Sequence, residues 1–413
     1  MEGEGEKNMK LSTGLSILAI TFTYGCKKLY APPAITADNN YLVVEGVIAA
    51  GQDSTIINLS RTVQLSGVNS HKRELGAKVS VGDEQGANYS LSEVDSGKYA
   101  APPLNLDNSH KYRLNITTTD GQIYSSDYVP VKVTPPIDSL YYKIQSTTIN
   151  YYNNIQSSGL EIYADTHDPA NNTRYYRWDY TETYIYQTDG QSDYILDTTN
   201  PDSLKWSRLR TPAEQIHTCY ITMNSSAIKV NNTAALSSDV IANNAITQIP
   251  STSEKVLHRY SIIVRQYALT KDGYNFWAML KKNTQQIGTI FDAQPSANTT
   301  NLHCTSDPSR IVLGYVSASS ITQKRIFIDQ TQLPYWPYNS PLLCSPDGAC
   351  WGKGAPLPQM LSYGQLVPTG PIVATAGCLG EKMPSFAVSV QDYTCVDCRI
   401  HLGGKTIKPA FWK

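Results

Sequence analysis

Charged side chains are scarce in this chain. Asp, Glu, Lys and Arg make up 17% of its 413 residues, against roughly 25% in a typical soluble protein, so Ser, Thr, Asn and Gln must supply much of the polar surface. The 34 basic and 35 acidic residues nearly cancel, which removes the electrostatic case for a nucleic-acid partner. Phenylalanine is also rare, with 6 residues against 28 tyrosines. Tyrosine suits β-strands and half-exposed contact surfaces, because its ring is apolar and its hydroxyl can stay hydrated.

Motifs for catalysis and cofactor binding are missing as well. The sequence contains no G-x-S-x-G, H-E-x-x-H, EF-hand loop or G-x-G-x-x-G. Gly404-Lys405-Thr406 resembles the end of a P-loop, but Arg399 stands where the first glycine is required. The densest group of titratable residues, Asp165–Pro169, ends in Asp168-Pro169, a pair typical of a turn, and a metal site is the less favoured alternative. We therefore expect a protein that is not an enzyme and that holds neither a cofactor nor a metal.

Long apolar runs are absent too. The run nearest the N-terminus, Leu11–Phe22, has about a dozen residues, whereas a bilayer span needs roughly 20. It follows Met9-Lys10, a basic start typical of a signal peptide. The segment Thr23-Tyr24-Gly25-Cys26 then resembles the lipobox of bacterial lipoproteins, in which the cysteine receives a lipid and becomes the mature N-terminus. The alternative is a secretory signal with an incidental cysteine.

These features predict a lipid anchor. Residues 1–25 are expected to be a lipoprotein signal peptide, Cys26 the lipidated residue and residues 26–40 a polar tether. No later segment approaches a membrane span, so the mature protein is expected to be anchored to the membrane but not embedded in it. Whether it faces the periplasm or the cell surface stays open.

The other cysteines are disulfide candidates, because export would place them in an oxidising compartment. They are Cys219, Cys304, Cys344, Cys350, Cys378, Cys395 and Cys398. Their odd number leaves at least one thiol unpaired. Cys395-Val396-Asp397-Cys398 is a C-x-x-C that could be part of disulfides, half of a zinc site or a redox pair. Structural disulfides are favoured, since a second finger-like pair and a βαβ setting are both missing.

Short runs of alternating polar and apolar residues begin at Tyr41 and recur at about ten-residue spacing. They cover residues 41–48, 54–61, 78–81, 88–91, 98–100, 112–118 and 122–128. Turn residues such as Ser96-Gly97 and Asp120-Gly121 separate them. This pattern predicts an immunoglobulin-like β-sandwich over residues 41–135, ending at Pro135-Pro136, where a ladder cannot continue.

Residues 136–413 are predicted to form a second, larger and mostly β domain, so that the fold class is all-β. Strand patterns cover residues 160–166, 174–187, 218–223, 259–270 and 310–317. The pattern over 174–187 is so long that we expect it to bend or change partners midway. One short helix is predicted over 271–286, with Phe276, Trp277 and Leu280 on the face that packs on the sheet. Cysteine, proline and glycine become dense after Leu333, which predicts a disulfide-stapled, loop-rich C-terminal lobe.

Two aromatic stretches are candidates for contact surfaces. Tyr175–Trp178 lies in a predicted strand, so only alternate rings would be available. Tyr335–Tyr338 lies in the proline-broken loop Pro334–Pro341, where packing demands are weaker. Tyr335 and Trp336 are therefore the candidate binding residues. The alternative is that Trp336 fills a small core beneath the region of Cys344 and Cys350.

Several segments match a known family. They are Leu42–Gly46, Trp277–Leu280, Ile290–Pro295, Asp307-Pro308, Ile311–Ser320, Cys395-x-x-Cys398-Arg399 and Lys408-Pro409-x-Phe411-Trp412. In these residues the chain resembles the Bacteroidota envelope lipoproteins catalogued as domain of unknown function 4249. The resemblance implies a cell-envelope lipoprotein of a kind often encoded beside TonB-dependent outer-membrane receptors, and it implies no particular reaction.

These observations predict a non-enzymatic binding partner at the outer membrane, accessory to a TonB-dependent receptor in nutrient uptake. The alternative is a structural or adhesive envelope lipoprotein without a transport partner, and an enzyme with an unrecognised site is a third hypothesis. A receptor gene beside this one would favour the first over the second. The ligand is not identified by the sequence.

Overall fold

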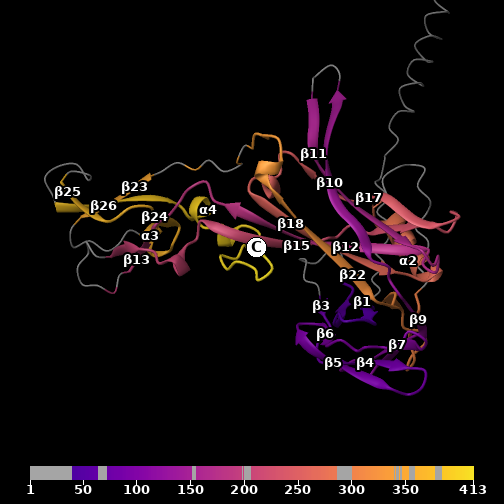
Figure 1. The fold of residues 1–413 in the computed structure, drawn as a ribbon. Helices are drawn as coiled ribbons and strands as arrows, with labels where there is room; N and C mark the ends of the chain where they lie inside the picture. The colour runs from indigo at the N-terminus through magenta and orange to yellow at the C-terminus, as the bar shows by residue number, and fades with distance from the viewer. Residues whose placement is uncertain are drawn as a thin grey trace, which may run out of the picture.

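The computed structural model describes residues 40–63, 72–150, 155–197, 199, 206–285, 300–338, 340, 344, 347–352, 359–376 and 384–413. Within these ranges the chain is mostly β and forms three parts: a closed sheet, a pair of stacked sheets and a distal lobe (Figure 1). The predicted signal peptide and all of the predicted tether except Asn40 lie outside these ranges, and so does Cys26.

The first part is a sheet that closes on itself. Its early strands are β1 (Leu42–Ala49), β2 (Thr55–Arg61), β3 (Lys72–Arg73), β4 (Lys78–Asp83), β5 (Asn88–Asp95), β6 (Lys98–Ala101), β7 (Lys111–Thr117), β8 (Ile123–Ser126) and β9 (Val129–Lys132). Three more come from far along the chain: β19 (Leu302–Cys304), β20 (Val312–Gly314) and β21 (Ser317–Ser319). Pairing runs β7-β4-β5-β6-β2-β1-β21-β9, and β9 pairs back with β7.

This closed sheet is barrel-like and not clearly the immunoglobulin-like sandwich that the strand spacing predicts. The early strands lie close to where the alternation places them, and β2 buries every second residue, as a half-buried strand should. Closure depends instead on β21, which pairs in parallel with both β1 and β9. The range 41–135 does not contain that strand, so the spacing within this range could not indicate closure.

The late strands contribute to the core of the barrel. Leu302, Cys304, Val312, Val316 and Ala318 are buried in the same cluster as the early strands. The single strand expected over 310–317 is wrong, because the chain forms β20 and β21 with a break between them. Gly314 ends β20 with a φ of +126°, and a Cβ there would collide with the carbonyl oxygen of Val44. Only glycine lets the two backbones approach this closely.

The second part consists of two sheets packed face to face. One contains β10 (Ile137–Asn150), β11 (Ile155–Asp168) and β17 (Asp239–Pro250). The other contains β15 (Thr218–Asn224), β12 (Tyr175–Gln187), β18 (Arg259–Ala268) and β22 (Ile321–Asp329), with β16 (Lys229–Asn232) also on β12. Buried residues from both sheets, including Ile162, Trp178 and Tyr260, form one core.

Strand β12 changes partners midway, as its length predicts. Residues 175–178 pair with β16, and residues 181–187 pair with β15 on the same side. The predicted helix is α2 (Lys271–Gln285), which confirms it to within a residue. Phe276 on its inner face is buried, and Trp277 lies against Arg177 of β12 with the guanidinium carbon 4.5 Å from the ring centroid.

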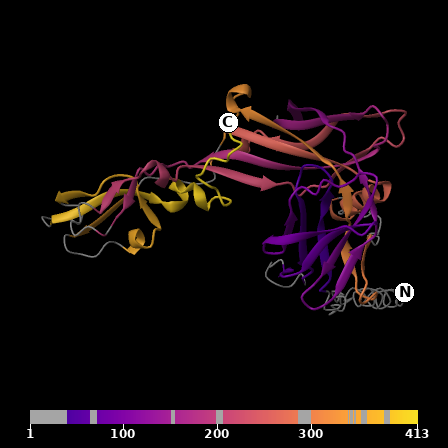
Figure 2. The same cartoon turned by 60° about the horizontal axis from the view of Figure 1, so that its bottom comes forward.

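The third part is a distal lobe, which extends to the side away from the barrel (Figure 2). It contains β23 (Asp347–Gly352), α3 (Gln359–Ser362), β24 (Leu366–Pro368), β25 (Val373–Ala376), β26 (Pro384–Asp392) and α4 (Tyr393–Val396). A hairpin from the middle of the chain, β13 (Tyr194–Leu196) and β14 (Ser207–Leu209), joins it, and Leu196 and Trp206 pack on its core. After α4, a short 3-10 turn (Cys398–Ile400) leads the chain back to the stacked sheets, where it ends (Figure 1).

Candidate binding surface around the aromatic loop

Two disulfides fasten the C-terminal region. Cys219 on β15 bonds to Cys398, and Cys344 bonds to Cys395. The predicted disulfide-stapled C-terminal region is thereby confirmed. Cys304 is buried and is the free cysteine of the described residues. Of the remaining candidates, Cys378 lies outside the described residues, and Cys350 is described only by its backbone in β23.

The two cysteines of the C-x-x-C do not bond to each other. Cys395 ties α4 to the start of the distal lobe, whereas Cys398, three positions on, ties the same turn to the stacked sheets. Both sulfurs are used in disulfides with distant partners, so neither is a thiolate that could ligate zinc or act as a dithiol redox pair. Through its two disulfides, the motif links the distal lobe to the stacked sheets.

The aromatic loop between β22 and the lobe separates its two candidate residues. Trp336 and Leu333 are partly buried and pack against the core between the stacked sheets, so Trp336 contacts the edge of this core and not a separate small one beneath Cys344. Tyr335 between them is 84% exposed. The loop therefore presents one large ring to solvent on a backbone that is fixed on both sides.

The root of the loop rests on a cluster that no pattern in the sequence indicates, formed by Tyr186, Glu254, Tyr338 and His401 (the junction cluster). The rings of Tyr186 and His401 stack with centroids 4.1 Å apart. His401 Nε2 lies 2.8 Å from Glu254 Oε1, an oxygen that also accepts a hydrogen bond of 2.7 Å from the Tyr184 hydroxyl. Four distant segments of chain meet here, and only the folded topology brings them together.

Burial and negative charge keep the phenols of the junction cluster protonated. Burial raises the pKa of Tyr338, and the nearby charges of Glu254 and Asp189 raise it further. The pKa of Tyr186 is raised by burial and by the same two carboxylates. Neutral phenols beside a shared carboxylate act as hydrogen-bond donors and packing surfaces. The cluster is thus suited to fixing the loop and supplies no activated nucleophile.

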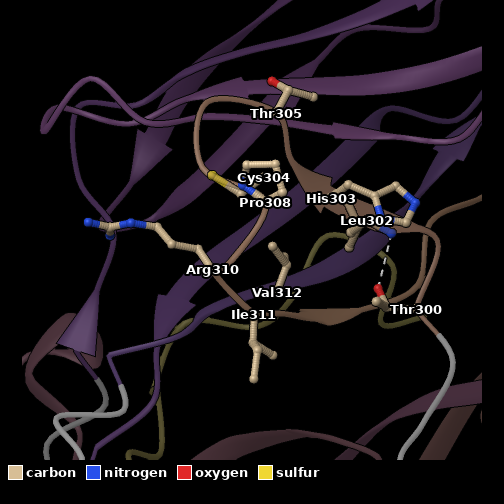
Figure 3. Close-up of a pocket in the computed structure, with 9 residues that line it drawn as sticks. All are labelled: Thr300, Leu302, His303, Cys304, Thr305, Pro308, Arg310, Ile311 and Val312. Carbon is tan, nitrogen blue, oxygen red and sulfur yellow. Dashed lines mark hydrogen bonds between the residues drawn. The ribbon is translucent and has the colours of Figure 1, made fainter.

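A separate cavity of about 370 Å³ lies on the barrel beside β19 and β20 (Figure 3). Its wall is largely apolar, with Leu302, Ile311 and Val312, and it includes the free Cys304. Arg310 extends away from the cysteine in this view and bonds to Asp307 at 3.3 Å. Within the described residues the hydrogen-bonding neighbours of the thiol are the neutral Ser306 and Gln122, so the arrangement lacks the adjacent base that activates a nucleophilic cysteine.

The cluster Asp165–Asp168 lies at the end of strand β11, and the chain turns at Pro169, as the Asp-Pro ending predicts. Asp168 accepts hydrogen bonds from the backbone N–H groups of Ala170, Asn172 and Thr173. Burial raises the pKa of this carboxyl, but these donors outweigh burial and leave the pKa below its usual value. Across the described ranges, no group of three or more His, Cys, Asp or Glu side chains is placed to hold a metal ion.

No helix in the described part of the chain is long and apolar enough to cross a membrane.

The geometry as a whole defines an all-β protein with a closed sheet, a stacked pair of sheets and a stapled lobe. The family described as domain of unknown function (DUF4249) matches residues 28–325, and the chain belongs to that family. The match covers the barrel and most of the stacked sheets. No curated protein matches the chain.

Proposed function

We propose that this chain is a lipoprotein, anchored at the outer membrane through Cys26, that acts as a non-enzymatic binding partner of a TonB-dependent receptor in nutrient uptake. The observation that carries the binding role is Tyr335, which is 84% exposed and stands between the packed residues Leu333 and Trp336. An exposed aromatic ring on a fixed backbone loses little conformational freedom on docking, so most of its contact energy appears as affinity.

The anchor supports the same proposal. The run Leu11–Phe22 followed by Cys26 has the pattern of a lipoprotein signal, and the family resemblance implies genes beside TonB-dependent receptors. A lipid tether keeps the protein near other proteins of the same membrane, which raises its effective concentration for a receptor without requiring tight contacts. Docking through one exposed ring would then suffice for a reversible complex.

The docking test compares two exposed tyrosines. Tyr335→Ala should lower the amount of the receptor encoded nearby that co-purifies with the tagged protein from solubilised membranes, because the contact ring is lost. Tyr363→Ala in the distal lobe is the matched control, since Tyr363 is 69% exposed. Both variants should keep the wild-type free energy of unfolding to within about 0.5 kcal/mol, as for other surface substitutions.

Equal receptor recovery from all three proteins would contradict docking through Tyr335. A wild-type protein that brings down no receptor, even after chemical cross-linking in intact cells, would favour the adhesive or structural alternative. Trp336→Ala is unsuitable as a first variant, because it removes a ring that packs against the core and so confounds binding with folding.

The anchor test is independent of docking. Cys26→Ala should release the protein from the membrane fraction, because a single lipidated cysteine is the proposed attachment. Fractionation followed by mass spectrometry of the mature N-terminus measures this directly. A variant that still sediments with membranes, or a mature N-terminus elsewhere, would contradict lipidation at Cys26.

A further inference from the structure

A short segment near the C-terminus has an unusual balance of charge. Residues 399–413 contain neither Asp nor Glu, although acidic and basic residues nearly cancel over the whole chain. Its Lys and Arg residues are Arg399, Lys405, Lys408 and Lys413. Asp397 neutralises Arg399, with Nη2 of the arginine 2.6 Å from Oδ2. In the described residues no carboxylate bonds to the exposed side chains of Lys405 and Lys408, so their positive charge is uncompensated.

The same segment exposes aliphatic side chains. Ile407 is 81% exposed, Leu402 59% and Ile400 47%. A single exposed apolar residue is ordinary on a protein surface, but these three lie in one short stretch together with the uncompensated lysines. Leu402, Lys405, Ile407 and Lys408 are called the terminal patch below.

Leu402 has a backbone conformation that does not favour leucine. Its φ is +49°, and Gly403 follows with a φ of +70°. The left-handed region suits Gly and Asn, whereas a bulky side chain there costs free energy. The side chain held in this way is mostly exposed, so burial in a core does not offset the strain. Strain without burial indicates a role for the exposed side chain itself.

The backbone around the terminal patch is fixed to the stacked sheets (Figure 1). The disulfide Cys219–Cys398 precedes it. Within it, the backbone N–H of Tyr220 donates to the Lys405 carbonyl at 2.8 Å, and the N–H of Lys405 donates to the Tyr220 carbonyl at 3.1 Å. After it, the buried ring of Trp412 meets the ring of Tyr220 edge-on, with centroids 5.2 Å apart. A segment fixed in this way loses little conformational freedom when it makes a contact.

The composition of the terminal patch fits a lipid surface better than a protein surface. Protein-binding hot spots are rich in Trp, Tyr and Arg, and protein interfaces are poor in Lys. The patch instead combines Lys with Leu and Ile, and Trp412 of the same segment is buried. Segments at the membrane surface are held by apolar side chains in the headgroup region and by basic side chains attracted to anionic lipids. The patch supplies both.

We propose that the terminal patch binds the surface of a bilayer that contains anionic phospholipid. Leu402 and Ile407 enter the headgroup region, and Lys405 and Lys408 lie at the level of the lipid phosphates. The contact is small, and its effect is to orient a body that an anchor already holds near the membrane, because proximity makes a weak contact effective. This orienting effect rests on the proposed anchor, whereas the contact itself does not require Cys26.

The test measures hydrogen exchange by peptide for the full chain mixed with an excess of vesicles. One set of vesicles contains phosphatidylcholine alone, and the other contains equal parts of phosphatidylcholine and phosphatidylglycerol. Ile407 and Lys408 lie outside helices and strands, so their amides exchange readily in the free protein. Exchange in residues 400–408 should slow in the anionic vesicles and much less in the neutral ones, and added salt should reverse the slowing. Because the vesicles are in excess, the comparison is valid with or without a lipid on Cys26.

A pair of double variants tests the lysines. Lys405→Gln combined with Lys408→Gln should abolish the slowing in anionic vesicles, because the attraction to the lipid phosphates is lost. Lys78→Gln combined with Lys111→Gln is the matched control, since it removes the same charge from two exposed positions of the barrel. The control should show the wild-type slowing. All four lysines are exposed, so neither double variant should impair folding.

A second pair tests the strained leucine. Leu402→Asn should weaken the slowing while its stability stays at or above that of the wild type, because Asn adopts the left-handed conformation more readily. Leu236→Asn is the matched control, since Leu236 is 55% exposed and lies between β16 and β17. It should keep the wild-type slowing. A Leu402→Asn variant that loses stability and keeps the slowing would assign Leu402 to packing and contradict its role in the contact.

Equal exchange in the two types of vesicle overturns the proposal, and so does slowing that survives the loss of Lys405 and Lys408. Slowing that occurs in isolated outer membranes but in neither type of vesicle also overturns it and indicates a protein partner instead. Tyr335→Ala should leave the slowing unchanged, and fractionation of Cys26→Ala reports on the anchor alone. Failure of the terminal patch is therefore distinct from failure of the receptor contact or of the anchor.

Discussion

The barrel and the distal lobe are both built from β-strands, but different interactions hold them together. The barrel closes its hydrogen-bonded ring through β9 and β7 and encloses an apolar cluster drawn from almost every strand. The described core of the distal lobe is limited to Leu361, Ile372, Phe386, Val388 and Val390. The lobe is instead fastened by Cys344–Cys395, and Cys219–Cys398 fastens the adjoining turn to the body.

This difference follows from size. A small unit buries too little apolar surface to offset the conformational entropy of its chain. A disulfide compensates by restricting the unfolded chain, and the restriction grows with the length of the closed loop. The loops closed here span sequence separations of 51 and 179 residues, for which the entropy model gives roughly 4–5 kcal/mol each. The lobe thus depends on covalent closure, whereas the barrel depends on its core.

Reduction should therefore have the largest effect and should act on one region only. We expect a reductant to unfold the distal lobe and its attachment while the barrel stays folded, since the barrel contains the free Cys304 and no disulfide in the described residues. Hydrogen exchange measured by peptide, with and without reductant, would show protection lost in residues 359–398 and retained in residues 42–132. Simultaneous loss in both regions would contradict this division.

Counting thiols sharpens the same comparison. Under oxidising conditions and in denaturant, Cys304 should react with a thiol reagent, and the four bonded cysteines should not. Mass spectrometry of the labelled peptides reports in addition whether Cys350 and Cys378 are labelled or paired with each other. Label on Cys219 or Cys395 without reductant would contradict the pairing described above.

A pair of glycine substitutions should show an effect of intermediate size, and here the barrel should lose more stability than the distal lobe. Gly314→Ala should destabilise the barrel by roughly 3 kcal/mol, because it combines a strained φ with a clash against the Val44 carbonyl. Gly364→Ala in the distal lobe is the matched control, since its φ is +71° but no atom lies within 4 Å of the added Cβ. It should cost about 1 kcal/mol. Chemical denaturation of both variants measures the difference, and equal losses would mean that the backbone angle and not the close approach governs Gly314.

The smallest effect expected is a dependence on pH near the junction of the lobe and the stacked sheets. The pKa of His258 is lowered by burial and then by the charge of His217. A histidine with a lowered folded pKa favours the neutral folded state, so its contribution is complete above the unfolded pKa of about 6.5 and is lost as the pH falls through the folded value. The thermal midpoint should decrease as the pH is lowered from about 7.5 to 5.5. The decrease should be smaller in His258→Gln. An unchanged slope in that variant would assign the pH dependence to other groups.

Local patterns predicted the local elements well. The alternation around Ile57 and Leu59 placed β2, and the spacing of Phe276 and Trp277 placed α2. Strands β10, β17 and β22 were missed, because polar runs such as Asn243-Asn244 and Gln323–Arg325 interrupt their alternation of apolar and polar residues. Only the buried face of such a strand carries the apolar pattern, and a mean over both faces conceals that pattern.

The sites depend on long-range pairing, which the sequence does not specify. The odd number of cysteines implied a free thiol, but only the fold identifies Cys304 and separates the partners of Cys395 and Cys398.

The origin of β21 also constrains the order in which this protein can fold. Strand β1 pairs with β21 on the side away from β2. Strand β21 is made much later than β1, because the roughly 270 residues between Ala49 and Ser319 take about 15–50 s to synthesise at 5–20 residues per second. Throughout that interval β1 and β9 are the unpaired edges of an incomplete sheet. Exposed edges of this kind recruit strands from other chains. A nascent or truncated chain that ends before β19 is therefore the form of this protein with the greatest tendency to aggregate.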